Sequence, residues 1–219
     1  MTFIEALRGA AHASGTELPE PVLEACAAHY AMLCAWNQTH NLTRIVDPAD
    51  AARRHYLDCL LPLLAWPAPA SFVDVGSGAG FPGLMAALAW PTSHGVLIEP
   101  ARKRASFLAL AAAEIGVQRR IEVVGAGTGQ HKAERVLSRA TFSAGKRYQL
   151  APMAASPGEV GLWGLPHEVT TWEAEAATWG FSGLAPLHYR VSGLEERCVL
   201  RASRPKLGDV SRGTSRDDQ

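Results

Sequence analysis

The spacing of hydrophobic and polar positions predicts helices throughout the first third of the chain. Apolar residues recur at helical intervals in residues 3–13 and 19–37, each forming one apolar stripe. A third helix is expected to start after Asp47, which can cap it, with Pro48 in the first turn. We expect this helix to end within residues 62–66, so residues 1–66 are predicted to form a helical amino-terminal extension.

Beyond residue 66, short apolar strands alternate with helices, an order typical of a parallel α/β sheet with helices on both faces. The predicted strands are residues 72–75, 96–99, 120–124, 135–139 and 159–163, followed by a closing hairpin of 184–191 and 196–202. The predicted helices are residues 84–88, 101–115, 141–155 and 171–178. The α/β domain is therefore expected to cover residues 67–202. Residues 203–219 are charged and poor in apolar side chains, which predicts a disordered tail.

A cluster of glycines follows the first predicted strand. Gly76, Gly78 and Gly80 lie between the strand and the next helix. Glycine allows positive φ angles and lets a ligand approach the backbone closely. Strand, glycine turn and helix form the opening unit of a Rossmann-like fold, in which a cofactor lies at the carboxyl end of the first strand.

The residues around the turn bear on the kind of cofactor. Residues 78–83 match G-x-G-x-x-G, but the turn begins two residues earlier and Asp74 lies inside the strand before it. A buried acid suits the cationic sulfonium and amino groups of S-adenosylmethionine better than a pyrophosphate. Glu99 ends the second strand about 20 residues further on, where a carboxylate binds ribose hydroxyls. The pattern therefore favours S-adenosylmethionine over a nicotinamide cofactor. The alternative is that the glycines form only a turn and that Glu99 is only a solvated acid at the end of a strand.

Composition adds limits to this picture. With 219 residues, 47% hydrophobic and 19% charged, the chain resembles ordinary globular proteins that hold one α/β domain and a small appendage. The first residues lack the pattern of a signal peptide, and no apolar run is long enough to span a bilayer. The four cysteines lack C-x-x-C spacing. We expect a cytoplasmic protein with reduced thiols, no membrane segment and no metal.

The formal net charge of zero hides an uneven distribution. Residues 101–147 carry ten Lys and Arg against three Glu, whereas acidic residues dominate the first 70 positions. A basic segment beside a cofactor site suggests an anionic partner such as nucleic acid. Solvated basic helix faces are also common, so charge alone leaves both interpretations open.

Several longer motifs carry a resemblance to a known family. They are Trp-Asn-Gln-Thr-His-Asn-Leu-Thr at 36–43, Arg-His-Tyr-Leu-Asp-Cys-Leu at 54–60, the glycine segment at 73–83, Arg-Lys-Arg at 102–104 and Ser-Arg-Ala at 138–140. In order and spacing this set resembles the bacterial 16S ribosomal RNA guanine-N7 methyltransferases, also called glucose-inhibited division protein B. The resemblance extends from about residue 33 to residue 140 and fades beyond it.

The resemblance implies a class I S-adenosylmethionine-dependent methyltransferase domain with a helical extension. The reaction would move a methyl group from S-adenosylmethionine to N7 of a guanine in small-subunit ribosomal RNA, with the RNA or the small subunit as partner and the enzyme as a monomer. The cofactor-binding residues would be Asp74, Gly76, Ser77, Gly78, Phe81, Glu99, Thr128, Gly129 and Arg139. Among them, Glu99 would bind the ribose, Thr128 and Gly129 would lie beside the adenine, and Arg139 would lie between cofactor and target base.

The proposed chemistry needs alignment more than proton transfer. Guanine N7 has a free lone pair at neutral pH, so no general base is expected, only alignment and exclusion of water. Arg139 and Asn41 are the predicted catalytic positioning residues. The predicted RNA-binding residues are Asn41, Arg44, Arg54, His55 and Lys103. His55 and Asp58 share a helix face and either pin the loop that contains Asn41 or only brace their own helix.

The carboxyl-terminal third departs from the family pattern. Leu162-Trp163-Gly164 stands where the family has Lys-Gly, and Cys198 stands where a histidine is usual. These changes keep two alternatives open: a methyltransferase-like paralogue with another substrate, and an inactive RNA-binding or assembly protein.

Overall fold

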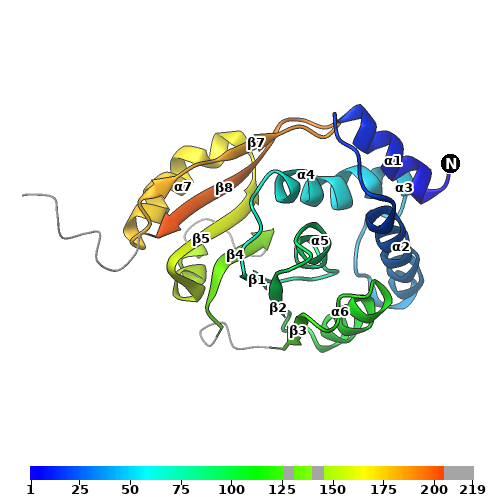
Figure 1. Ribbon diagram of the computed structural model, residues 1–219, viewed down its shortest axis with the longest axis horizontal. Coiled ribbons are helices and arrows are strands. Elements are labelled where there is room, and N and C mark those ends of the chain that lie inside the picture. Colours follow the sequence, from blue (N-terminus) through cyan, green and yellow to red (C-terminus); the bar gives the residue numbers. More distant parts are fainter. Residues whose placement is uncertain (126–130, 140–145, 205–219) are drawn as a thin grey trace, which may run out of the picture.

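The computed structural model describes residues 1–125, 131–139 and 146–204 and contains one eight-stranded sheet (Figure 1). The strands are β1 (Ser71–Val75), β2 (His94–Ile98), β3 (Ile121–Val124), β4 (Ala133–Arg139), β5 (Ala154–Gly164), β6 (Gly183–Leu184), β7 (Leu187–Tyr189) and β8 (Arg197–Arg204). Their order is β3-β2-β1-β4-β5-β8-β6, and β7 also pairs with β8. Strands β1 to β5 are parallel, and β8 is antiparallel to β5.

The helices lie on both faces of this sheet. They are α1 (Phe3–Ala13), α2 (Glu20–His40), α3 (Pro48–Ala51), the π-helix η1 (Ala52–Leu57), α4 (Asp58–Leu64), α5 (Gly83–Ala89), α6 (Arg102–Glu114), the 3₁₀ helices η2 (Arg147–Met153) and η3 (Pro166–Glu168), and α7 (Val169–Thr178). In Figure 1, α1, α2, α5 and α6 lie on one side of the strands and α7 on the other. The expected class, an α/β sheet covered on both faces, is confirmed.

Two hydrophobic clusters separate the faces of the sheet. Successive side chains of a strand point to opposite faces, and Phe72 and Val73 accordingly belong to different clusters. The Phe72 cluster includes buried residues of α1, α2, α4, α5 and α6, whereas the Val73 cluster includes those of η2 and α7. The helical extension therefore shares one continuous core with the sheet.

Local signals predicted the first helices well. Helix α1 has the predicted bounds, and the Asp47 side chain accepts bonds from the backbone of Ala49 and Asp50 at the start of α3. Helix α2 continues to His40, three residues beyond the predicted end at residue 37, and there Asn41 adopts the left-handed conformation with φ 47°. Asparagine tolerates this conformation better than most residues, which makes it a natural helix terminator.

Two sequence-based expectations are wrong. The predicted helix over residues 141–155 is not formed by its described part, because residues 147–153 form a 3₁₀ helix and Ala154 already belongs to β5. Pro152 lacks a backbone N–H and clashes with a preceding turn of α-helix, which favours the short form. The predicted tail also starts too early, since β8 extends through Ser203 to Arg204. Residues 205–219 lie outside the described residues.

A group of charged and aromatic side chains connects the end of the extension to the sheet. The Trp66 indole N–H donates to Glu159 Oε2 at 3.1 Å, and Arg135 donates to the same oxygen at 2.6 Å. Arg201 donates to the other oxygen at 3.2 Å, and the Arg135 guanidinium lies 3.8 Å from the Trp66 ring centroid. Glu159 on β5 thus holds β4, β8 and the extension together.

We expect Glu159→Gln to lower the free energy of unfolding at neutral pH by about 2–3 kcal/mol, because it removes the charge that two arginines share. Burial alone would raise the pKa of Glu159, but its bonds to Arg135 and Arg201 outweigh burial and hold the pKa below its ordinary value. A carboxyl group whose pKa is lower in the folded protein than in the unfolded chain stabilises the folded state at pH values above its unfolded-state pKa. This stabilisation is lost as the pH falls through the folded-state pKa.

Urea unfolding of wild type and Glu159→Gln measures this effect. The difference between the two proteins should shrink as the pH falls from neutral toward about 3. Glu20→Gln is the matched control, because Glu20 pairs with Arg8 on the surface with about half of each side chain exposed. That variant should leave the free energy of unfolding close to the wild-type value, because an exposed ion pair contributes little. A Glu159→Gln effect that stays constant with pH would contradict the ionic explanation.

Candidate cofactor and nucleic-acid site

The glycine turn lies at the carboxyl end of β1. Gly76, Gly78 and Gly80 have φ angles of 75°, 57° and 94°, which favour glycine as the sequence predicts. The backbone N–H groups of Gly76 and Ser77 both donate to the carbonyl of Ile98, at 2.8 and 3.1 Å. The turn is thus attached to the end of β2, and its shape depends on residues that tolerate positive φ.

Glu99 bridges the turn and the start of α6. Its Oε2 accepts the N–H of Gly78 and its Oε1 accepts the N–H of Ala101, both at 2.9 Å, and the residue is 5% exposed. A carboxylate offers about four lone-pair positions, so two remain for a hydroxyl donor such as a ribose. Ribose binding by Glu99 stays a prediction.

Asp74 lies beneath the same turn. It is fully buried, and its Oδ2 accepts the N–H of Gly83 at 2.9 Å. A Cβ at position 83 would collide with Asp74 and Leu97, so glycine is required there. Within the described part of the chain, Oδ1 has no hydrogen-bond partner, and burial raises the pKa of Asp74 to about 7. A positively charged ligand beside the turn would favour the ionised form of this carboxyl, and Oδ1 is free to face it.

Phe81 joins the glycine turn to the helical extension. Its ring stacks on His55 with centroids 4.9 Å apart and contacts Tyr56 and His29 edge to face at 5.1 and 5.3 Å. The Arg139 guanidinium lies 5.3 Å from the ring centroid. The side chain is 6% exposed, and cofactor binding by Phe81 stays a prediction.

Arg139 lies at the end of β4 and binds residues of the extension. Its guanidinium donates to Asp58 Oδ2 at 3.1 Å and to the carbonyl of Arg54 at 3.2 Å. Burial alone would lower the pKa of Arg139, but the Cys59 thiol and the Asp58 carboxylate raise it above its ordinary value. The side chain is 16% exposed, so a permanent positive charge borders the site.

His55 connects Arg139 to the loop after α2. Its Nδ1 lies 3.2 Å from Arg139 Nη2 and its Nε2 lies 2.8 Å from Thr43 Oγ1. An arginine can only donate, so Nδ1 accepts and the hydrogen of the neutral ring is on Nε2, which donates to Thr43. Burial and the Arg139 charge lower the pKa of His55 to about 4. Neutral His55 thus pins the loop that follows Asn41, as the first of the two interpretations expects.

Asp58 is the centre of this group and gathers residues from the carboxyl-terminal third. Its Oδ1 accepts from the Tyr189 hydroxyl at 2.8 Å and from Arg197 Nε at 3.2 Å, and its carbonyl accepts from the Trp163 indole at 2.8 Å. Neither Tyr189 nor Arg197 is among the site residues that the sequence predicts. Arg197 lies in a motif that the resemblance singled out, but Tyr189 is 131 residues from Asp58 and carries no local signal.

A cavity of about 300 Å³ opens beside this group. It is lined by Ile45, Arg54, His55, Asp58, Arg139, Leu194 and Arg197. Three arginines against one aspartate make the wall positively charged. His55 and Arg139 also contact Phe81, so the cavity adjoins the glycine turn. The arrangement suits an anionic or hydrogen-bond-accepting ligand placed next to a cofactor.

The structure brings only part of the predicted site together. Arg139 contacts Arg54 and His55, and His55 holds Thr43, two residues after the exposed Asn41. Arg44 is exposed in the same loop, and Lys103 is exposed in the first turn of α6. The predicted residues Thr128 and Gly129 lie outside the described residues.

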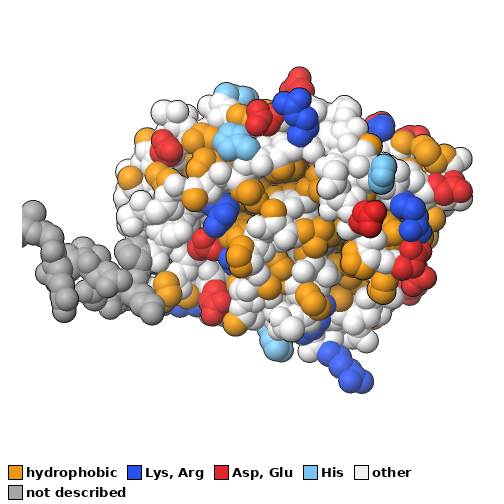
Figure 2. Space-filling model, turned by 45° about the horizontal axis from the view of Figure 1, so that its top comes forward, with side chains coloured by type: hydrophobic (Ala, Val, Ile, Leu, Met, Phe, Trp, Pro, Cys, Tyr) orange, Lys and Arg blue, Asp and Glu red, His pale blue; other side chains and the backbone are white. Residues whose placement is uncertain are grey.

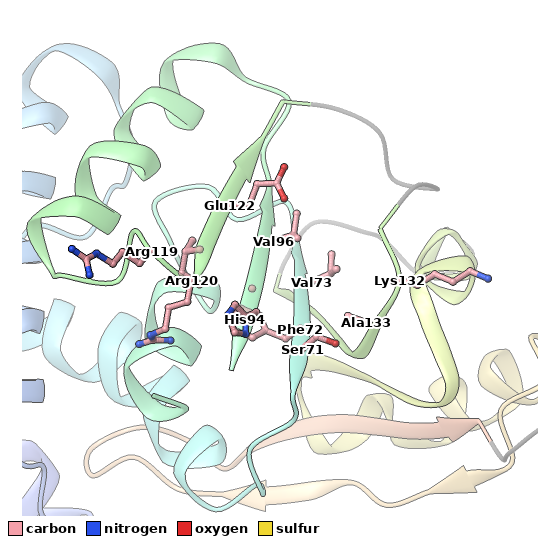
Figure 3. Close-up of a pocket in the computed structure, with 12 residues that line it drawn as sticks. Ser71, Phe72, Val73, His94, Val96, Arg119, Arg120, Glu122, Lys132 and Ala133 are labelled. Carbon is pink, nitrogen blue, oxygen red and sulfur yellow. The ribbon is translucent and has the colours of Figure 1, made fainter. Parts of the chain in front are cut away.

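A second pocket of about 290 Å³ lies at the amino ends of β1 and β2, opposite the end of β1 that carries the glycine turn (Figure 3). It is bordered by the first residues of β1 and β2, Ser71 and His94. Arg120 also lines this pocket. Its guanidinium donates hydrogen bonds to the carbonyls of Ala87, Trp90 and Ser93, at and just beyond the end of α5. Ligands of open α/β sheets bind at the carboxyl ends of the strands, so this pocket is not the cofactor site.

Neither a metal site nor a membrane span is found in the described parts of the chain. Residues 1–125, 131–139 and 146–204 contain no group of three His, Cys, Asp or Glu side chains placed to hold a metal ion. The helices within those same residues are too short or too polar to cross a bilayer.

Comparison with known proteins identifies the class and then the family. The fold is that of class I S-adenosylmethionine-dependent methyltransferases: the methyltransferase SibL in its apo form superposes with a TM-score of 0.61 over 92% of this chain and 74% of that one, at 14% identity. A ribosomal protein L11 methylase from Lactobacillus delbrueckii superposes with a TM-score of 0.54 over 67% and 77%, at 17% identity. Residues 23–190 match the GidB family, described as rRNA small subunit methyltransferase G, and the chain belongs to that family.

Two relatives illustrate the extent of the match. Ribosomal RNA small subunit methyltransferase G of Methylobacillus flagellatus is 39% identical over 130 residues, 58% of this chain and 62% of that protein. The protein of the same name in Myxococcus xanthus is 32% identical over 180 residues, 78% of this chain and 83% of that protein. The chain spans only 50–62% of the length of the first three relatives it matches.

Proposed function

We propose that this protein transfers a methyl group from S-adenosylmethionine to N7 of a guanine in small-subunit ribosomal RNA. Membership of the family supports the reaction. One structural observation indicates which residues would perform it. The charged group of Arg139, Asp58 and Arg197 lies directly beside the glycine turn, with Phe81 in contact with both. A cofactor on the turn would therefore adjoin a cavity that attracts RNA.

S-adenosylmethionine, when bound, supplies the activated methyl group. The glycine turn and Glu99 would hold it at the carboxyl end of β1, and the unpaired oxygen of buried Asp74 would favour its positive charge. Arg139 suits the other substrate, because a guanidinium donates well to guanine O6 or to a phosphate. With His55 neutral and no proton to remove from N7, the residues act by alignment and exclusion of water.

The remaining basic residues would hold the RNA strand. Arg44, Arg54 and Lys103 are exposed and suit phosphate contacts, which position an RNA without reading its sequence. On the face shown in Figure 2, acidic and basic side chains are interspersed around a hydrophobic centre, so charge does not mark that face for RNA. We expect the protein to act as a monomer in the cytoplasm, where its ribosomal substrate is found.

Trp163 favours one alternative substrate class. It stands where the family has a lysine, and its indole donates to the Asp58 carbonyl while the residue is 7% exposed. A neutral, buried ring therefore stands beside the candidate RNA site in place of a lysine charge. A methyltransferase with a different substrate is therefore the second candidate, ahead of an inactive RNA-binding protein.

Methyl transfer from labelled S-adenosylmethionine to small ribosomal subunits that lack guanine-N7 methylation tests the proposal. We expect label on a single guanine N7 after mapping. Binding of S-adenosylmethionine without label on the subunits would favour the alternative substrate. Absence of both binding and label would contradict an enzymatic role.

A further inference from the structure

A fully buried histidine of the extension contacts the glycine turn. His29 lies on α2, and its Nε2 is 2.9 Å from the carbonyl oxygen of Ala79, 50 residues further along the chain. Its Nδ1 is 2.7 Å from the hydroxyl of Tyr56 in η1. The ring also contacts Phe81 and Phe107 edge to face, at 5.3 and 5.7 Å. His29 thus joins three segments at one point.

The two hydrogen bonds have a fixed direction. A carbonyl only accepts, so Nε2 carries the hydrogen and donates to Ala79. In a neutral ring Nδ1 then accepts, and the Tyr56 hydroxyl donates to it. Burial lowers the pKa of His29 to about 4, which keeps the ring neutral at physiological pH. Donation therefore runs from Tyr56 through His29 to Ala79.

Ala79 occupies the part of the turn that most needs an external restraint. It stands between Gly78 and Gly80, both with positive φ, and glycine has many other backbone states available. The peptide that joins Ala79 to Gly80 is held on one side by His29 and on the other by the bond from Gly80 N–H to the Ser77 carbonyl, at 2.7 Å. Together these bonds set the plane of that peptide.

We propose that His29 is a positioning residue for cofactor binding: from the helical extension, it holds the glycine turn in the conformation that accepts S-adenosylmethionine. The inference rests on the proposed function for the identity of the cofactor. Without the Ala79 bond, the turn samples other conformations. The affinity for the cofactor then falls in proportion to the fraction of molecules whose turn keeps the binding-competent conformation.

The same elements also contact the candidate RNA site. Asn37 in the last turn of α2 accepts, through its side-chain oxygen, the N–H of Thr43 in the loop that follows, at 2.9 Å. His55, next to Tyr56, holds Thr43 and Arg139. The extension therefore contributes to the cofactor site as well as to the nucleic-acid site.

The test measures S-adenosylmethionine affinity and thermal stability in wild type and three variants. His29→Leu removes both hydrogen bonds, and we expect the Kd to rise about 5- to 10-fold, the effect of losing one net hydrogen bond. His29→Gln keeps a donor and an acceptor and should bind within about threefold of wild type. Phe107→Leu is the matched control, because Phe107 packs on His29 without a bond to the turn; it should lower Tm and leave Kd unchanged.

The outcomes separate this inference from the proposed function. An unchanged Kd in His29→Leu, or an equal rise in Phe107→Leu, would overturn the positioning role. Wild type that fails to bind S-adenosylmethionine would instead contradict the proposed cofactor. If His29→Leu does not fold, His29→Phe replaces it: the variant keeps a ring against Phe81 and Phe107 but cannot donate to Ala79, and Kd should again rise about 5- to 10-fold. No rise in that folded variant would overturn the inference.

Discussion

Replacing Gly78 with arginine should abolish S-adenosylmethionine binding while the protein stays folded, with Kd at least about 100-fold higher. Gly78 has a φ of 57°, and its N–H donates to Glu99. A side chain in the left-handed conformation costs about 1–3 kcal/mol, which the turn would relieve by changing shape. The long guanidinium side chain adds bulk and positive charge beside a site proposed for a cationic cofactor.

Gly78→Ala separates strain from bulk. A Cβ at position 78 meets only the Gly76 carbonyl oxygen, at 3.8 Å, so alanine fits in space and tests the backbone conformation alone. We expect a loss of about tenfold for alanine, well below the loss for arginine. Equilibrium binding and circular dichroism on both variants measure affinity and folding. Unchanged affinity in Gly78→Arg would refute this placement of the cofactor site.

Replacing Arg139 with alanine should lower methyl transfer by about 10²- to 10³-fold and reduce stability far less, because it removes the group that we propose contacts the reacting base. The fold has other support at this point. Asp58 keeps its bonds from Tyr189 and Arg197 after Arg139 is removed, so the buried carboxylate is not left unpaired. Arg139→Lys restores the charge without the planar fork and should recover only part of the activity.

Single-turnover methyl transfer and urea unfolding, measured on the same preparations, test this separation. Arg53→Ala is the matched control, because Arg53 pairs with Asp50 on the surface at 3.3 Å. That variant should change stability by less than about 1 kcal/mol and leave transfer near the wild-type rate. If Arg139→Ala loses as much transition-state stabilisation in methyl transfer as free energy of unfolding, the role of Arg139 is structural.

Local sequence patterns determined most of the fold. Helix α1 and the cap at Asp47 follow from periodicity and side-chain hydrogen bonding within a few residues. Strands β1 to β4 follow from short apolar runs bounded by glycine and polar residues. The positive φ of Gly76, Gly78 and Gly80 is likewise a local requirement, which is why the glycine turn could be predicted. Interactions of this range depend on residue type and spacing, and both can be read directly from the chain.

Only the tertiary structure decided which side chains meet. Asp58 gathers Arg139 and Tyr189 from 81 and 131 residues away, and His29 reaches Ala79 across 50 residues. Such contacts depend on how the extension packs on the sheet, and no local propensity encodes that geometry. The short helix η2 shows the same limit, because a helical pattern around Pro152 gave way to the start of β5. The glycine turn is thus a local property of the sequence, whereas the charged group beside it exists only once distant segments are packed together.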